Sequence, residues 1–131
     1  MGLKDRIEEE MVVDTESVLE EHFDDANQLF RIFQNGTIAI EDSYKDAPWK
    51  EKILIYFVGR QYAFEGGQAE NPTLPYDFFY GKFDLDNSTI RAYMNDLKDD
   101  NVVQKSEESN EWELLVDNLP EALSRIEGVD V

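Results

Sequence analysis

The residues that could carry acid–base or metal chemistry are a single histidine and a large set of carboxylates. His22 is expected on a helix, beside Glu20, Glu21, Asp24 and Asp25. A general base or a metal ligand needs a defined pocket with partners, whereas a histidine among surface acids is usually hydrated. We therefore expect no catalytic or metal-binding function for His22.

A second candidate is the segment 84–88, in which oxygen-bearing side chains alternate as they do in a calcium-binding loop. Such a loop, counted from Asp84, needs glycine at its sixth position and glutamate at its twelfth. This chain has Thr89 and Asn95 there. Helix capping by the same residues is the simpler explanation, so we expect no calcium site.

Other catalytic signatures are missing from the sequence. The chain has no cysteine, which excludes disulfides, thiolate zinc sites and cysteine nucleophiles. It contains neither a glycine-rich phosphate loop nor a serine-nucleophile motif. With 30 acidic residues, no particular carboxylate pair stands out as catalytic. We expect a protein that is not an enzyme and that needs no metal or cofactor.

The charge balance is the most unusual bulk property. The 30 acidic residues face only 12 basic ones, which gives a net charge of −18. The acids are spread along the chain and do not form a terminal tail. Acids dispersed over a folded surface resemble proteins of salt-in halophilic archaea, where high ionic strength screens their repulsion.

The length and composition predict one folded domain. With 131 residues and a hydrophobic fraction of 41%, the chain can bury a core without disulfides or metal. We expect a flexible acidic leader at 1–13 and a single domain at 14–131, divided into 14–73, 74–116 and 117–131. No apolar run approaches the ~18 residues that cross a bilayer, so we expect no membrane association and a cytoplasmic location.

The segment 14–73 is expected to contain a helix, a hairpin and a long helix. Asp14 or Thr15 can cap a helix whose apolar face is Val18, Leu19, Phe23 and Ala26. Asn-Gly at 35–36 lies between two β-prone runs, which is a strong hairpin signal. Asp46 is expected to cap a broad-faced scaffold helix, with proline in its first turn, that ends at 66–67.

The segment 74–116 is expected to form two helices followed by a hairpin. A short helix at 76–80 precedes a compact turn, and a second helix covers 88–98 with Ile90, Met94 and Leu97 as its buried stripe. Asn101 is expected in the left-handed conformation. Strands at 102–105 and 111–116 then flank a polar loop, which completes the order of a winged helix-turn-helix. A final short helix at 119–126 is expected to pack back on the domain.

Residues 87–103 resemble the recognition helix and first wing strand of archaeal winged-helix regulators. In that family a serine or threonine opens the helix, apolar residues stand where Ile90, Met94 and Leu97 do, and glycine or asparagine precedes paired valines. The resemblance covers 74–116, about a third of the chain. It implies an α+β winged helix-turn-helix that binds double-stranded DNA and regulates transcription, and the acidic composition indicates a haloarchaeal member.

The resemblance also implies which side chains contact DNA. Arg91 is the best candidate for guanine and Asn95 for adenine, because these pairings satisfy the donors and acceptors of the base edges. The acidic loop at 106–110 is not expected to contact phosphates. The full candidate set is Lys82, Asn87, Ser88, Thr89, Arg91, Ala92, Asn95, Lys98 and Lys105.

Two alternatives to DNA binding stay open. The first is a winged-helix protein-interaction module, in which the free helix face and outward aromatics such as Tyr80 and Tyr93 engage another protein. The second is an acidic DNA mimic. The acidic charge favours a protein partner unless high salt screens it, and Arg91 and Asn95 also fit ordinary hydrated surface residues. We expect a homodimer, because one short recognition helix gives little specificity.

Overall fold

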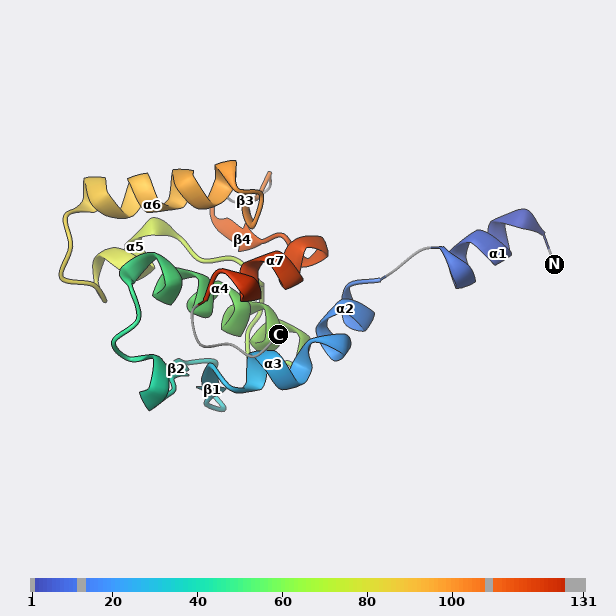
Figure 1. Ribbon diagram of the computed structural model, residues 1–131, viewed down its shortest axis with the longest axis horizontal. Coiled ribbons are helices and arrows are strands. Elements are labelled where there is room, and N and C mark those ends of the chain that lie inside the picture. The colour runs from blue at the N-terminus through green and yellow to red at the C-terminus, as the bar shows by residue number, and fades with distance from the viewer. Residues whose placement is uncertain (1, 12–13, 108–109, 127–131) are drawn as a thin grey trace.

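The computed structural model describes residues 2–11, 14–107 and 110–126. It is an α+β fold of helices and two small antiparallel hairpins, both of which contact α4 (Figure 1). The elements are α1 (Leu3–Glu10), α2 (Thr15–Glu21), α3 (Phe23–Asn27), β1 (Phe30–Ile32), β2 (Ile38–Ile40), η1 (Asp42–Tyr44), α4 (Trp49–Glu65), α5 (Tyr76–Tyr80), α6 (Asn87–Asp99), β3 (Val103–Lys105), β4 (Trp112–Leu114), η2 (Val116–Asn118) and α7 (Leu119–Ser124).

Helix α1 occupies most of the expected leader. It has no buried residue and extends away from the remaining elements in Figure 1. Leu3 and Met11 are 73% and 76% exposed, so apolar burial does not hold this helix against the rest of the fold.

The single helix predicted after Asp14 is wrong, because the chain forms two helices that meet at His22. Asp14 caps α2 as expected: its carboxylate accepts the Ser17 backbone N–H at 2.7 Å, and this bond lowers the pKa of Asp14. Phe23 is 51% exposed, whereas Ala26 is buried. Both lie in α3, so the predicted apolar face is only partly covered there.

The first hairpin forms where Asn-Gly predicts it. Phe30 pairs with Ile40 and Ile32 with Ile38. Gly36 has a φ of +89°, and a Cβ there would lie 2.5 Å from the carbonyl oxygen of Gln68. Only glycine combines that backbone conformation with so close an approach, so the turn is fixed against the loop that follows α4.

Helix α4 is the scaffold that the sequence predicts, although its N-terminus differs. The N-cap is Pro48 and not Asp46, and no side chain supplies a cap hydrogen bond. Most of the helix is covered, since β1, β2 and β4 all contact it. At Gly59 a Cβ would lie 2.8 Å from Ile38 Cγ2, which shows how closely β2 packs on the helix.

The second half of the chain places α5, a turn, α6 and the hairpin β3–β4 in the predicted order. Both strands are shorter than predicted: β3 begins at Val103, and β4 comprises only Trp112–Leu114. Leu74 forms an isolated antiparallel bridge with Trp112, which adds a third backbone segment beside this hairpin. Asn101 has a φ of 60°, as predicted.

Helix α7 packs against the domain as predicted but ends at Ser124, two residues earlier than expected; Leu119 and Leu123 of the helix and Ile126 beyond it are all buried. The preceding turn η2 contacts α2, so the end of the described chain is joined to the first half. Within the described ranges, no helix combines the length and apolar character needed to cross a membrane.

Candidate nucleic-acid interface

Helix α6 lies along one edge of the molecule, with the body of the fold on one side of it (Figure 1). Ile90, Met94 and Leu97 form its buried stripe, and none of them is more than 1% exposed. Their three- and four-residue spacing directs one face of the helix into the core, as the sequence predicts. The polar residues of α6 are therefore divided between two flanks of this stripe.

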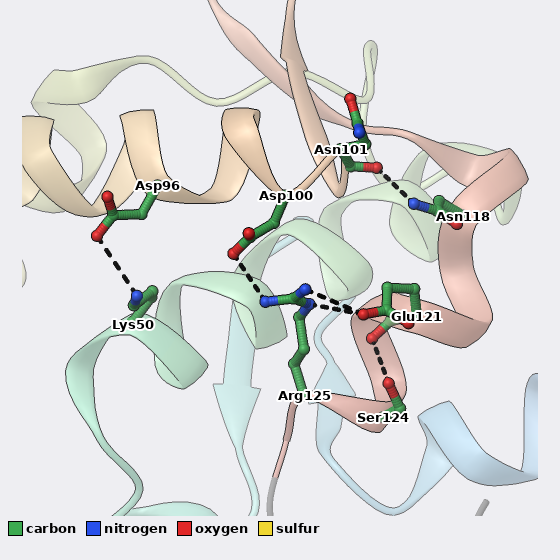
Figure 2. A network of polar contacts seen from close by, with 8 residues as sticks. All are labelled: Lys50, Asp96, Asp100, Asn101, Asn118, Glu121, Ser124 and Arg125. Atoms are coloured by element: carbon green, nitrogen blue, oxygen red, sulfur yellow. Dashed lines mark hydrogen bonds and ion pairs between the residues drawn. The ribbon is translucent and has the colours of Figure 1, made fainter.

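On one flank, acidic residues of α6 pair with bases from other elements (Figure 2). Asp96 accepts from Lys50 of α4 at 3.4 Å, and Asp100, just after α6, accepts from Arg125 at 2.7 Å. Arg125 also contacts Glu121 at 3.0 Å. We call this side, comprising Asp96 and Asp100 with Lys50 and Arg125, the paired flank.

The paired flank also holds the C-terminal end of α6. Asn118 Nδ2 donates to the carbonyl oxygen of Asn101 at 2.7 Å, which satisfies a backbone acceptor just beyond the helix (Figure 2). The aromatic candidate Tyr93 is half-buried, with Lys50 Nζ 6.0 Å from its ring centre. Tyr80 is also half-buried and stacks on Tyr76, so neither predicted outward aromatic is fully exposed.

The other side of α6 carries most of the candidate residues. Arg91, Asn95 and Lys98 are exposed, and their spacing of four and three residues places them on one face. We call Arg91, Asn95 and Lys98 the open flank. Asn87, Ser88 and Ala92 are exposed as well, whereas Thr89 is half-buried.

Arg91 and Lys98 differ from most bases of this protein because they have no partner. The chain has 12 basic residues. In the described ranges, Arg91, Lys98, Lys105 and Lys4 form no ion pair, hydrogen bond or cation–π contact. The other eight do, namely Arg6, Arg31, Lys45, Lys50, Lys52, Arg60, Lys82 and Arg125. Three of the four unpaired bases therefore lie on α6 and the adjoining strand β3.

The helix sequence explains why the open flank is unpaired. Three and four residues from Arg91 stand Asn87, Ser88, Met94 and Asn95, none of which is acidic. The same holds for Lys98, whose neighbours at this spacing are Met94, Asn95, Asn101 and Val102. By contrast, Arg6 and Glu10 form a pair at this spacing, as do Lys45 and Asp42.

The hairpin β3–β4 adds Lys105, which is exposed at the end of β3, opposite Trp112. Next to it, Gln104 donates to Glu113 at 3.0 Å. Glu107 beyond the strand is exposed, while residues 108–109 of the acidic loop lie outside the described residues.

Lys82 lies in a different environment from the other candidates. Its ammonium group sits over the rings of Tyr56 and Phe78, at 5.5 and 5.0 Å from their centres. Burial raises the pKa of Tyr56. Lys82 also lines a pocket with Arg60 of α4, a neighbour that the sequence does not reveal because the two are 22 positions apart.

The residues considered for metal binding or catalysis, His22 and the acids near the start of α6, have ordinary structural environments in the described chain. The His22 side chain is 16% exposed, so it is less hydrated than expected, and its Nδ1 lies 3.8 Å from Asp25. No group of three or more His, Asp or Glu within the described ranges is arranged to hold a metal ion. Asp86 is the N-cap of α6, but its backbone carbonyl, not its carboxylate, accepts the first helical N–H groups.

Comparisons of the chain with protein-family models, curated proteins and solved structures found no match.

Proposed function

We propose that residues 74–116 form a winged helix-turn-helix and that the chain is a DNA-binding transcriptional regulator of a halophilic archaeon, without catalytic activity. The order of α5, turn, α6 and hairpin supports this proposal, as does the bridge between Leu74 and Trp112 that widens the hairpin. In this proposal α6 is the recognition helix and β3–β4 is the wing.

The observation that carries the proposal is the distribution of unpaired bases. In a chain with 30 acids and 12 bases, a base can readily find an acidic partner. Arg91, Lys98 and Lys105 nevertheless have none among the described residues, and all three are exposed on α6 or β3. Cationic groups free of internal partners are what phosphate and base-edge recognition requires.

The net charge opposes DNA binding less than the composition alone implies. Asp96, one of the acids on α6, is directed to Lys50 on the paired flank. Asp99 is the other exposed acid within the helix, so its one negative charge is outnumbered by the two positive charges of Arg91 and Lys98. In molar salt the counterion contribution is small for any DNA-binding protein, so base-edge hydrogen bonds and apolar contacts would dominate.

The rival proposal of a protein-interaction module on α6 has weaker support. Interface centres are typically aromatic and apolar. The exposed large hydrophobic residues of the described chain are Leu3, Ile7, Met11, Phe23, Phe33 and Phe64, none of which lies on α6. The open flank is polar and cationic, which favours a nucleic acid as its partner over an apolar protein surface. A DNA mimic would bind a basic surface, which a cationic flank would repel.

The test is DNA binding by the full chain across a series of potassium chloride concentrations. A duplex is first selected from a random-sequence library, and its affinity is compared with that of a random duplex. We expect Arg91→Ala to weaken binding of the selected duplex by about 1–3 kcal/mol, the value of one bidentate base contact, and to change binding of the random duplex little. Lys98→Ala should weaken binding of both duplexes, and the slope of log binding constant against log salt concentration should fall in magnitude by about one.

Lys45→Ala is the matched control, because it also removes one positive charge, from a lysine just after η1 that is already paired with Asp42. It should leave both affinities unchanged. If selection enriches no sequence and neither duplex binds at any salt concentration, the regulator proposal is wrong. Light scattering of the free protein tests the expected homodimer separately.

A further inference from the structure

A small pocket lies between the first hairpin, α4 and the turn that follows α5. It has a volume of about 200 Å³, and its walls include Gly36, Ile38, Arg60, Leu74, Phe78 and Lys82. The remaining lining residues are Asn35 and Thr37 of the hairpin turn. We call it the Arg60–Lys82 pocket. Two cations and no carboxylate line it, in a chain whose acids outnumber its bases.

The guanidinium of Arg60 is incompletely satisfied. Its Nη2 donates to Asn71 Oδ1 at 3.0 Å, while its Nε is buried without a hydrogen-bond partner in the described residues. Arg31, which lines the hollow between α3 and β1, instead donates to Asn27 and Phe30 and pairs with Glu41. A guanidinium offers five N–H donors, and the described residues pair one Nη2 donor of Arg60 while Nε is enclosed, so the remaining Nη donors are the ones available to an anion.

The second cation is also available. Lys82 Nζ lies over the faces of Tyr56 and Phe78, and it forms no hydrogen bond or ion pair within the described residues, so it retains N–H donor capacity. Ile38, Leu74 and Phe78 supply apolar walls beside these cations. The pocket therefore combines an anion-binding end with an apolar, partly aromatic surface.

We propose that the Arg60–Lys82 pocket binds a small organic carboxylate that carries an aromatic or compact apolar body. A carboxylate matches the planar fork of a guanidinium. The volume is below the ~300–1,000 Å³ typical of pockets for drug-sized ligands, which limits the ligand to one ring or its equivalent. This proposal does not depend on DNA binding by α6 and the wing, because no lining residue of the pocket lies on α6, β3 or β4.

The experiment is an NMR titration of the 131-residue chain with benzoate in molar potassium chloride. We expect saturable amide shifts centred on Gly36, Thr37 and Phe78. Acetate, which lacks the ring, and benzyl alcohol, which lacks the charge, should each bind at least about tenfold more weakly. Inorganic phosphate is the fourth probe and should also bind more weakly than benzoate.

Lys82→Gln should weaken benzoate binding about tenfold, since it removes one charge-assisted contact at an exposed position. The matched control is Lys52→Gln. Lys52 belongs to α4 and, like Lys82, holds its ammonium group over an aromatic ring, that of Trp49, but it does not line the pocket. It should bind benzoate as the wild type does.

Four results would overturn the proposal: no saturable shifts with benzoate, shifts centred elsewhere, equal binding of acetate or phosphate, or an unchanged affinity in Lys82→Gln. The titration uses no DNA. Its failure therefore leaves the regulator proposal intact, and a failure of DNA binding leaves the pocket intact.

Discussion

The paired flank and the open flank belong to the same helix but differ in how their charges are satisfied. On the paired flank, Lys50 of α4 pairs with Asp96, and Arg125 at the end of α7 pairs with Asp100. On the open flank, Arg91 and Lys98 have no partner in the described residues. Acids are abundant in this chain, so the contrast reflects position: a flank covered by other elements gains partners, and an uncovered one keeps its bases free.

The buried stripe between the flanks should contribute far more to stability than the ion pairs do. Leu97 is 1% exposed, and Leu97→Ala removes apolar contacts and leaves a cavity. We expect the free energy of unfolding to fall by about 2–5 kcal/mol, measured by urea denaturation at constant salt. Asn95→Ala on the open flank is the control and should change it by less than about 0.5 kcal/mol. A similar loss in both variants would mean that α6 is not held by its stripe.

The ion pairs of the paired flank should have a smaller, salt-dependent effect. Arg125→Ala removes the contacts with Asp100 and Glu121, but the Arg125 side chain is 37% exposed. Solvent screening therefore limits the expected loss to about 0.5–1 kcal/mol at low ionic strength, and molar potassium chloride should reduce it further. Thermal unfolding at two salt concentrations measures this, with Lys105→Ala as the unpaired control. An effect of Arg125→Ala that does not change with salt would contradict the electrostatic explanation.

The smallest effect concerns DNA affinity and compares an acid of the paired flank, Asp96, with Asp99, an acid of α6 outside that flank. Asp99 is exposed and unpaired in the described chain, whereas Asp96 is bound to Lys50. If the outer side of α6 faces phosphates, Asp99→Asn should strengthen binding of a random duplex about two- to fivefold at low salt, the range of one exposed charge interaction.

Asp96→Asn removes the same charge from the paired flank and should strengthen binding less than Asp99→Asn does. Filter binding or fluorescence anisotropy would resolve the difference. Equal gains in both variants would show that only the net charge of the protein matters and that the flanks are equivalent.

Local sequence patterns predicted the features that depend on neighbouring residues. The Ile90, Met94 and Leu97 stripe, the capping of α2 by Asp14, and the left-handed Asn101 all follow from spacing or from a single residue's conformational preference. The hairpin at Asn-Gly belongs to the same class, because turn chemistry is local.

The sequence predicted two helix boundaries wrongly. The apolar spacing of 18–26 favours one helix, but the chain breaks at His22. Helix α4 begins after Pro48, although Asp46 is the better cap by residue type. A local reason applies there, because the residue before a proline disfavours helical dihedral angles and Ala47 therefore stays outside the helix.

The sequence by itself determined that Arg91 and Lys98 have no ion-pair partner within the helix, since no acid stands three or four residues from either. That no other element of the described chain supplies a partner was decided by the tertiary structure. The tertiary structure alone decided the paired flank and the Arg60–Lys82 pocket. Lys50 and Asp96 are 46 residues apart, and Arg60 and Lys82, which line the same pocket, are 22 residues apart. Contacts across such separations depend on how helices pack, which local periodicity does not specify.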